Sequence, residues 1–536
     1  MGIFNSIFFS LTRKERILIA VLFLIFTITF FTRVVFAINE NSEFVPVEGG
    51  SYIEGVVGQP VSINPVISNN TIDYDLSSLV YPKLGEMAEN INIEENRAYT
   101  VTIPEELTWS DGERLTTDDI IFTINMIQDP EVNSPLSKSW QGIVVERISE
   151  LQVKFNLPAP YVFFGDNIDK LPIIPSHIFS SIPYSNLRLS SYNLEPISAG
   201  PYEFDSFKRR RDGFITEYKF SVNENYYGEK PYIKDLYFKF FENEEALIDA
   251  FRKRDIDGFG SLSIVDFSIS SANIEVMKMP RYYSIFFNPR STSALNDVDF
   301  REALKSTINK EKLIKNVLKE KAQIITAPSF NENLPTLSIE ESREIIRKFK
   351  EDQENNELTL EIIIPDVEFI KETAKFIKDS WENVGIDSVD VIVLSSDDFT
   401  NTVIRERNYE AVIFGNILEN NLDLFPFWHS SQRFYPGLNL SLYSNEDADT
   451  LIENIRQTED FSQRESQFSE LVEIINLDSP AVFLFSLPYT YIYNQKLKGF
   501  NSSFFNTAEN NLVIPSDRFK NIESWYVREA RIFIEN

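Results

Sequence analysis

The stretch from Gly415 to Gln432, GNILENNLDLFPFWHSSQ, gathers the side chains best suited to holding a ligand. Trp428 would supply an apolar ring for stacking, although a core tryptophan is the simpler explanation. His429 could bind nickel through its imidazole, yet the only other histidine, His177, is far away in the sequence. The acids Glu419 and Asp423 lie on the same stretch, and a solvated loop would explain both of them. This stretch is the first candidate for a ligand-binding loop.

The motifs of common enzymes are missing from the chain. The sequence has 2 His and 0 Cys, and it contains no H-E-x-x-H, G-x-S-x-G, P-loop or G-x-G-x-x-G pattern. The 81 acidic residues leave carboxylate catalysis open as an alternative. We therefore expect no catalytic residue, no metal site and no cofactor.

Composition narrows the class of protein further. A chain of 536 residues with 43% hydrophobic content is expected to fold, into two or three domains. The net charge of −30 argues against a nucleic-acid groove, because phosphate recognition needs clustered Lys and Arg. The absence of cysteine excludes disulfides and also a lipid-modified cysteine as a membrane tether.

The N-terminus offers another anchor. Arg13, Lys14 and Arg16 precede an apolar run from Ile17 to Ala37, which is close to the roughly 20 residues that cross a bilayer as a helix. Positive charge before the run favours a cytoplasmic segment 1–16 and export of everything after it. We expect an uncleaved anchor at 17–37 followed by a polar tether at 38–48. Cleavage after Ala37 is the alternative, and both interpretations place the body outside the cytoplasm.

The pattern of secondary structure is clearest around Pro104 to Asn125, PEELTWSDGERLTTDDIIFTIN. Alternation before this stretch predicts a strand, and Ser110-Asp111-Gly112 predicts a tight turn. Thr116 and Asp119 form a capping box for a helix, and Leu115 and Ile120 form its hydrophobic staple. Trp109 is expected to be a packing anchor beside the turn. Farther on, the sequence predicts a βαβ unit over 358–394 and therefore parallel strand pairing.

The stretch from Pro104 to Asn125 also resembles a motif of the extracellular solute-binding proteins of peptide and nickel ABC importers. Segments similar to that family follow its order from Gly50 to Phe500: SINP (62–65), LVYPKL (79–84), LTWSDGERLTTDDIIFT (107–123), PIIPSH (172–177), SAGPYEF (198–204), NENYYGEKPYIKD (223–235), DIDG (255–258), IFFN (285–288), DFREAL (299–304), YEA (409–411), LSLYSNEDADTL (440–451), DSPAVFLF (478–485) and LKGF (497–500). No single segment identifies the family, but about a dozen segments in the family's order do.

The resemblance implies a two-lobed α/β fold of the type II periplasmic-binding-protein kind (large cluster C), with the ligand enclosed between the lobes by hinge motion. The larger lobe would comprise 45–284 and 489–536, with an inserted subdomain at about 66–190, and the smaller lobe 285–488. Gly200, Pro201 and Tyr202 would form a hinge or structural bend. Asn64 and Asn288, at the ends of strands, would face the ligand.

The resemblance also implies a ligand. Peptide binders of this family pair an acid in the loop corresponding to 415–432 with the peptide α-amino group, a role that Glu419 or Asp423 could fill. Dipeptide binders clamp the carboxylate with an arginine before the helix corresponding to 369–381, but Ile364 to Glu368 contains none. The sequence therefore favours a longer peptide. A non-peptide solute, such as an oligosaccharide or nickel complex, and a scaffold that has lost its ligand are the alternatives.

The expected partners follow from this class. We expect an oligopeptide ligand, the permease and ATPase subunits of an ABC importer, and the membrane through the N-terminal helix. We expect no nucleic acid, and we expect the protein to act as a monomer.

Overall fold

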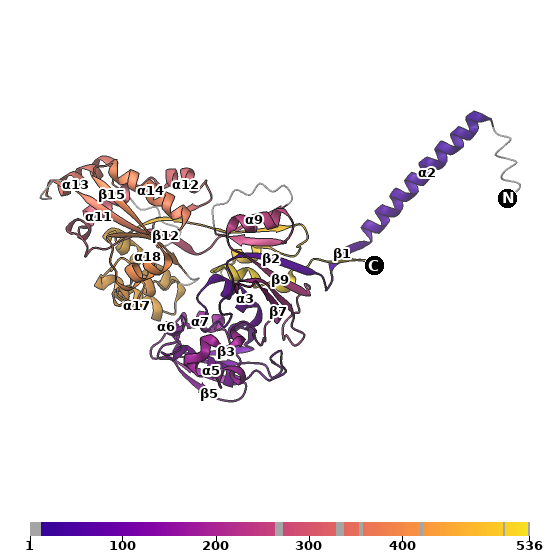
Figure 1. Cartoon of the computed structure of the whole chain (residues 1–536), viewed down its shortest axis with the longest axis horizontal. Helices are drawn as coiled ribbons and strands as arrows, with labels where there is room; N and C mark the ends of the chain where they lie inside the picture. Colours follow the sequence, from indigo (N-terminus) through magenta and orange to yellow (C-terminus); the bar gives the residue numbers. More distant parts are fainter. Residues whose placement is uncertain are drawn as a thin grey trace.

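The computed structural model describes residues 12–262, 272–328, 337–352, 357–418, 422–507 and 510–533. These residues form two α/β lobes, preceded by a long helix that projects away from them (Figure 1). The predicted two-lobed fold is confirmed. Each lobe is built on one mixed sheet, so its core lies in two layers between the sheet and the covering helices.

Lobe I is organised around a sheet whose seven described strands have the order β11-β18-β10-β2-β9-β8-β7. Its central strand, β2, pairs in parallel with both neighbours. One face packs on α3 (Thr71–Val80) and the other on α9 (Glu244–Arg252). The strands are β2 (Ser51–Val57), β7 (Tyr202–Arg209), β8 (Ile215–Val222), β9 (Asp235–Phe241), β10 (Gly258–Ser261), β11 (Ala272–Met277) and β18 (Tyr489–Asn494).

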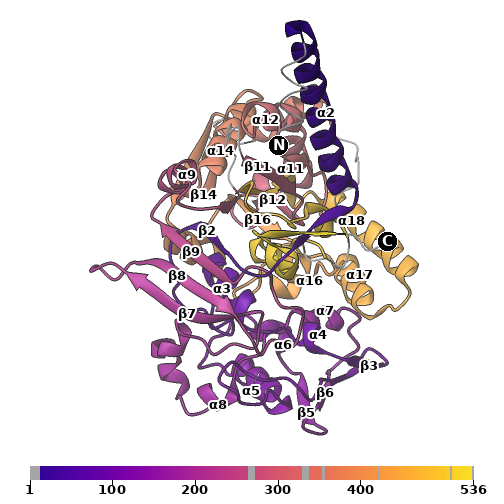
Figure 2. The ribbon, with the colours of Figure 1, turned by 90° about the vertical axis from the view of Figure 1, so that its right-hand side faces the viewer.

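A subdomain is inserted between β2 and β7. Its described strands form an antiparallel sheet of order β3-β4-β6-β5, made of β3 (Asn90–Glu94), β4 (Ala98–Thr102), β6 (Gln152–Asn156) and β5 (Val144–Arg147). Its helices are α4 (Leu84–Met87), α5 (Thr117–Gln128), α6 (Ser137–Trp140), α7 (Phe164–Lys170) and α8 (Ser176–Phe179). Figure 2 shows this subdomain below the sheet of lobe I.

Helix α5 begins as the sequence predicts. Thr116 is the N-cap, its backbone N–H donates to Asp119 at 2.9 Å, and its hydroxyl accepts from the Asp118 N–H at 3.3 Å. Leu115 and Ile120 are buried beside the cap, and Trp109 is fully buried. The cap, the staple and the buried tryptophan of this stretch therefore serve the fold.

Lobe II contains a sheet of six described strands in the order β13-β17-β12-β16-β14-β15. Helices α11, α13 and α14 cover one face, and α17 and α18 cover the other. The strands are β12 (Arg281–Phe287), β13 (Gln323–Ile324), β14 (Thr359–Pro365), β15 (Ser388–Leu394), β16 (Ala411–Ile417) and β17 (Ala481–Ser486). The helices are α10 (Ser293–Asn296), α11 (Val298–Ser306), α12 (Lys310–Asn316), α13 (Ile339–Glu351), α14 (Glu368–Glu382), α15 (Ser396–Phe399), α16 (Phe425–Trp428), α17 (Glu446–Gln457) and α18 (Phe461–Asp478).

The predicted βαβ unit is confirmed in lobe II. Strands β14 and β15 pair in parallel over their whole length, and α14 connects them. Gly385, after α14, has φ +124°, a backbone conformation that favours glycine and ends the helix.

Two segments cross between the lobes. The chain passes from β11 to β12 through 278–280, and returns from β17 to β18 through 487–488. The predicted hinge residues Gly200, Pro201 and Tyr202 lie elsewhere, at the start of β7 inside lobe I. The Gly200 N–H donates to the Val80 carbonyl at 2.9 Å, so this bend holds α3 against the sheet.

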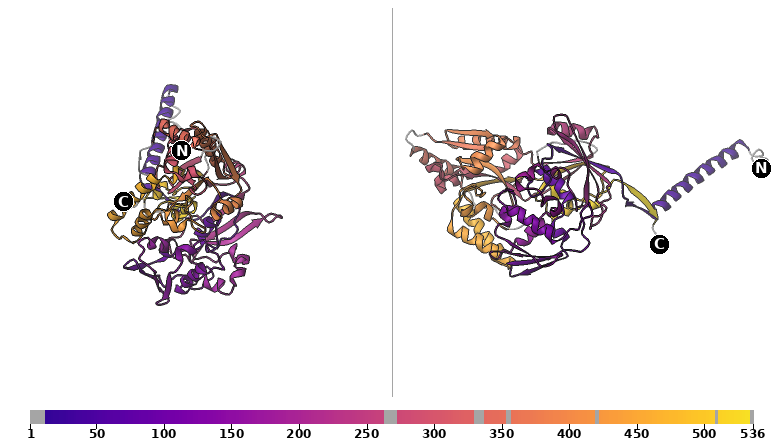
Figure 3. Two further views of the ribbon diagram at one scale, coloured as in Figure 1. Left: turned by 90° about the vertical axis from the view of Figure 1, so that its left-hand side faces the viewer. Right: turned by 60° about the horizontal axis from the view of Figure 1, so that its bottom comes forward.

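The N-terminal helix, α2 (Arg13–Glu40), is the one helix in the described residues that is long and apolar enough to cross a membrane, with a mean hydropathy of 2.5. The sequence predicts a polar tether at 38–48 after it. Instead, α2 continues to Glu40 and β1 (Ser42–Pro46) pairs with β19 (Glu529–Phe533). The C-terminal end of the described chain therefore lies at the base of α2 (Figure 3). The tether is structured because its partner strand comes from the opposite end of the sequence.

Candidate ligand-binding site

The two lobes touch where the loop before α7 meets the loop before α16 and the end of α17. Tyr161 of lobe I donates its hydroxyl to Asp423 Oδ2 of lobe II at 2.8 Å. Arg456, in the last turn of α17, forms an ion pair with the same oxygen, with Nε 3.3 Å away. The other Asp423 oxygen accepts the Phe425 N–H at 3.0 Å. Only 8% of the Asp423 side chain is exposed, so the seam between the lobes contains a largely buried carboxylate.

Arg456 connects this carboxylate to the aromatic side chains around it. Its guanidinium lies 4.5 Å from the ring centroid of Tyr161 and 4.3 Å from that of Phe425. Its backbone carbonyl accepts the Val162 N–H at 2.9 Å, which is a second bond across the lobes. Cations over aromatic faces are attracted by the ring quadrupole, so both rings hold Arg456 in place. Figure 2 shows α7 beside α16 and α17 at this seam.

The electrostatics favour the observed direction of the bond. Burial raises the pKa of the Tyr161 hydroxyl, and the nearby negative charge of Asp423 raises it further. The phenol is therefore protonated at neutral pH and acts as the donor. Asp423 accepts from Tyr161 as a carboxylate and can bind cationic groups at the seam.

Other contacts extend the seam on both sides. Phe163 of lobe I is buried within the hydrophobic cluster of lobe II that includes Trp428. Asn96 donates to the Glu459 carboxylate at 2.7 Å, and Lys138 donates to the Pro436 carbonyl. The seam thus combines one apolar insertion with polar pairs, an arrangement that can open and close without exposing a large core.

The residues predicted on the 415–432 loop differ in where they lie relative to the seam between the lobes. Glu419 lies outside the described residues. Trp428 is fully buried and packs against Phe286, Tyr443 and Phe483, so its ring belongs to the core of lobe II. Of the predicted residues of this loop that the structure describes, Asp423 is the one that bonds to the other lobe.

His429 is also buried and is held by its neighbours. Its ring stacks on Phe425 with centroids 4.4 Å apart, Nδ1 lies 2.8 Å from the Ser431 hydroxyl, and Nε2 lies 3.3 Å from the Glu453 carboxylate. Within the described part of the chain, no three His, Cys, Asp or Glu side chains are grouped to hold a metal ion. The contacts of His429 with Phe425, Ser431 and Glu453 therefore explain its burial without a ligand.

Asn64 and Asn288 lie away from the Tyr161–Asp423 contact. Asn288 is buried in lobe II and donates to the carbonyl of Tyr409 at 2.8 Å, so it fixes the chain after β12. Asn64 is fully buried in lobe I, where its side-chain Oδ1 accepts the Val66 N–H at 3.0 Å. Its Nδ2 has no hydrogen-bond partner among the described residues.

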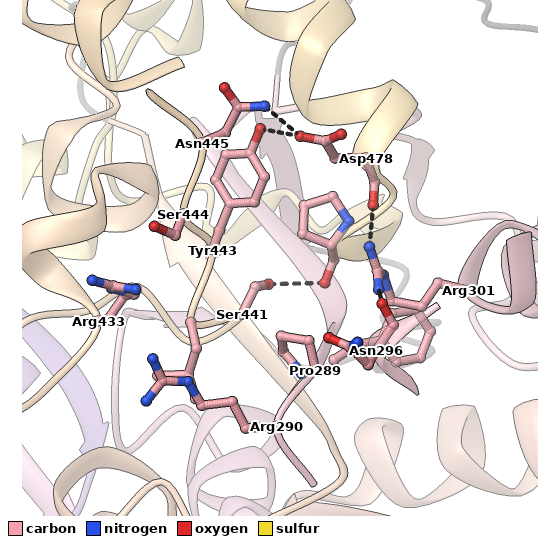
Figure 4. A pocket seen from close by; sticks show the side chains of 13 residues that line it. Pro289, Arg290, Asn296, Arg301, Arg433, Ser441, Tyr443, Ser444, Asn445 and Asp478 are labelled. Carbon is pink, nitrogen blue, oxygen red and sulfur yellow. Dashed lines mark hydrogen bonds between the residues drawn. The ribbon is translucent and has the colours of Figure 1, made fainter. Parts of the chain in front are cut away.

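A cavity of about 400 Å³ opens in lobe II, and every residue that lines it belongs to that lobe (Figure 4). Arg301 beside it donates to four backbone carbonyls, which leaves this arginine committed to the fold. Asp478 accepts from Tyr443 at 2.7 Å and Asn445 at 2.8 Å. The cavity therefore lies within one lobe, in contrast to the expected location of the ligand between the two.

Sequence reasoning missed Tyr161 and Arg456, whose side chains contact the Asp423 carboxylate. Tyr161 follows a proline-rich strand end, and Arg456 sits on an amphipathic helix, so each has an ordinary local explanation. Nothing local indicates that they meet, because one belongs to each lobe. Only the three-dimensional closure of the lobes reveals the group.

Comparisons with known proteins agree with this architecture. Residues 84–433 match the family model described as bacterial extracellular solute-binding proteins, family 5 Middle. The chain is 22% identical over 533 residues to the oligopeptide-binding protein AppA of Bacillus subtilis, covering 90% of this chain and 92% of AppA.

Solved structures show the same fold. The chain is similar to B. subtilis AppA in complex with a nonapeptide, with a TM-score of 0.75, 20% identity, and coverage of 90% of this chain and 100% of AppA. It is also similar to NikZ of Campylobacter jejuni in complex with Ni(L-His), with a TM-score of 0.72, 20% identity, and coverage of 89% and 99%. One fold therefore accommodates ligands of very different chemistry.

Proposed function

This chain belongs to the bacterial extracellular solute-binding proteins of family 5, and from that premise we propose that it captures oligopeptides between its two lobes for an ABC importer. The observation that carries the proposal is the buried carboxylate of Asp423 at the seam where the lobes close. The match to oligopeptide-binding AppA over most of both chains supports a peptide as the ligand.

Asp423 is proposed to receive the α-amino group of the peptide. An ammonium there would share the carboxylate with Tyr161 and Arg456 or replace one of them, since a carboxylate offers about four acceptor positions. Glu419 is the second candidate for this role. The lack of an arginine between Ile364 and Glu368 favours longer peptides, whose carboxylate needs no clamp.

The remaining partners follow from the same proposal. The permease and ATPase of an importer would receive the ligand, and the protein would act as a monomer. The helix α2 would remain in the membrane and hold the lobes on the extracytoplasmic side. Capture requires no bond to be broken, so we propose a binding role and not a catalytic one.

Native mass spectrometry of the folded body after gentle purification tests the ligand class. A heterogeneous peptide mass carried with the protein would support the proposal. A sugar or nickel complex would replace the peptide as ligand, and a clean protein mass with no thermal shift from a peptide library would contradict capture altogether.

Alanine variants test the proposed role of the acids. We expect Asp423→Ala, Glu419→Ala, or the double variant to weaken peptide binding by about tenfold or more in calorimetry, because a charge-assisted hydrogen bond is lost. Glu470→Ala, which changes an exposed acid on α18, is the matched control. Unchanged affinity in all three variants would contradict amine capture while leaving peptide capture open to the mass measurement.

A further inference from the structure

The ribbon formed by β1 and β19 begins almost at the end of the apolar helix. Helix α2 ends at Glu40, and β1 starts at Ser42. The two strands pair antiparallel with Ser42 opposite Phe533 and Phe44 opposite Arg531. Arg531 donates from Nε to the Ser42 hydroxyl at 2.7 Å and also bonds Asn39 in the last turn of α2. The C-terminal strand is therefore attached to the helix as well as to β1.

The other end of the ribbon is fixed to lobe I. The Val47 N–H donates to the Arg528 carbonyl at 3.2 Å, and the Gly49 N–H donates to the Tyr232 carbonyl at 2.7 Å. Gly50 has φ +79°, and a Cβ there would lie 2.6 Å from Val527 Cγ2. The chain between the helix and the lobe is thus hydrogen-bonded and close-packed along its length, so the ribbon is a short, stiff connector.

This connector exposes large apolar side chains. Phe44 is 62% exposed and Phe533 is 67% exposed. Residues opposite each other in an antiparallel pair share a face, so Phe44, Phe533 and Arg531 lie on the same face of the ribbon. The Arg531 guanidinium lies 5.3 Å from the Phe44 ring centroid. Segments that bind at a membrane surface combine apolar side chains such as Phe, Trp or Leu with Lys or Arg, and these two exposed Phe rings beside Arg531 have that composition.

The length of the helix places this face at the right depth. Helix α2 rises about 1.5 Å per residue, so the apolar run from Ile17 to Ala37 matches a hydrocarbon core of about 30 Å. The three helical residues that follow add about 5 Å, and the headgroup layer on each side is about 5–8 Å thick. Each extended residue after the helix adds about 3.3 Å, so Ser42 and its partner Phe533 would lie at the outer edge of the headgroup layer. Phe44 is two residues farther along the strand, and it reaches the same layer when the ribbon lies along the membrane surface and not along the helix axis.

We infer that the β1–β19 ribbon is a membrane-contact surface, with Phe44 and Phe533 inserted in the headgroup region of the same bilayer that α2 crosses. The inference rests on the proposed retention of α2 as an anchor. Its consequence is that the lobes are held close to the bilayer in a restricted orientation, since the ribbon is fixed to the membrane on one side and to lobe I on the other.

Depth measurement by spin labelling tests the inference, and the chain has no native cysteine to interfere. The full-length protein is placed in nanodiscs of phosphatidylcholine and phosphatidylglycerol, with a label at Phe44→Cys or Phe533→Cys, so that each variant keeps the other aromatic ring. We expect the ratio of collisions with oxygen to collisions with a water-soluble nickel chelate to be several-fold higher at both positions than at Leu189→Cys, an 82% exposed site in the inserted subdomain.

The outcomes separate the two proposals. Labels at 44 and 533 that are as accessible to the chelate as the label at 189, in protein that remains in the nanodiscs, would overturn the ribbon contact and leave the anchor intact. Protein that fails to enter nanodiscs would overturn the anchor and the ribbon contact together. Peptide capture is measured separately and is affected by neither result.

Discussion

At the scale of single residues, Arg518 forms a buried ionic cluster in the core of lobe I. Its guanidinium bonds both oxygens of Asp75, at 2.9 and 2.7 Å, and approaches Glu54 Oε1 at 2.9 Å. All three side chains are buried, and Tyr491 completes the set by donating to Glu54 at 2.8 Å. The cluster joins β2, α3, β18 and the C-terminal segment after it. One cation facing two carboxylates leaves an excess negative charge inside the protein.

Removing this cation should be severely destabilising. Arg518→Met leaves Asp75 and Glu54 buried without their partner, and breaking a buried ion pair in this way costs about 3–5 kcal/mol. Urea unfolding followed by circular dichroism would show the loss in the transition of lobe I. Lys208→Met removes the 74% exposed lysine of an ion pair with Glu217; it is the control and should leave the transition in place. A similar midpoint for both variants would contradict a structural role for the cluster.

The excess charge also predicts a pH dependence. Burial raises the pKa of Glu54 above its ordinary value of 4.5, against the opposing effect of Arg518. A raised carboxyl pKa means that the folded state binds the proton more tightly than the unfolded state. The stability that Glu54 contributes is therefore full below pH 4.5 and declines as the pH rises through its folded pKa.

Glu54→Gln does not titrate and should escape this decline. We expect the melting temperature of the variant, relative to the native protein, to rise as the pH increases above 4.5, because only the native protein loses the stability that a protonated Glu54 contributes. The exposed Glu470→Gln should show a constant difference over the same range. A constant or falling difference for Glu54→Gln would mean that Glu54 is not the titrating group.

At the scale of elements, local sequence determines what can be predicted. The capping box at Thr116 and the βαβ unit over 358–394 involve residues close together in the chain, so both were predicted from the sequence. The pairing of β1 with β19 joins the two ends of the chain, and no local pattern in Ser42 to Pro46 specifies that partner. For the same reason Asp423 was predicted as a ligand-binding residue, whereas its partners Tyr161 and Arg456 were not.

Gly200 tests the packing between two elements of lobe I. A Cβ at this position would lie 2.6 Å from the Leu79 carbonyl oxygen at the end of α3, and backbone cannot yield as a side chain can. Gly200→Ala should therefore cost about 1–3 kcal/mol of stability in urea unfolding, as overpacking does. Gly165→Ala in α7 is the matched control, because a Cβ there would meet nothing within 4 Å and alanine favours a helix. Equal stability of both variants would show that α3 can move away from β7.

At the scale of the whole molecule, ligand capture depends on the balance between open and closed lobes. The segments that cross between the lobes, 278–280 and 487–488, are short, so we expect relative motion of the lobes to be concentrated there. The closed arrangement is held by the contacts of Tyr161, Val162 and Phe163 with lobe II. A ligand can favour closure only to the extent that it binds the closed state more tightly than the open one.

The hydrogen bond from Tyr161 to Asp423 crosses this seam, and it can be removed by deleting a single hydroxyl group. Tyr161→Phe keeps the ring beside Arg456 but removes the donor to Asp423, and a hydrogen bond to a charged group is worth about 1.5–3 kcal/mol. That energy corresponds to a change of about tenfold or more in the ratio of closed to open molecules. Small-angle X-ray scattering should show a larger radius of gyration for the variant, and saturating peptide should restore the smaller value. Tyr192→Phe, in lobe I and away from the seam, should scatter like the native protein. If Tyr161→Phe combined with Arg456→Gln also leaves the scattering unchanged, the Tyr161–Asp423–Arg456 contact does not control closure, and the crossing segments alone must set the position of the lobes.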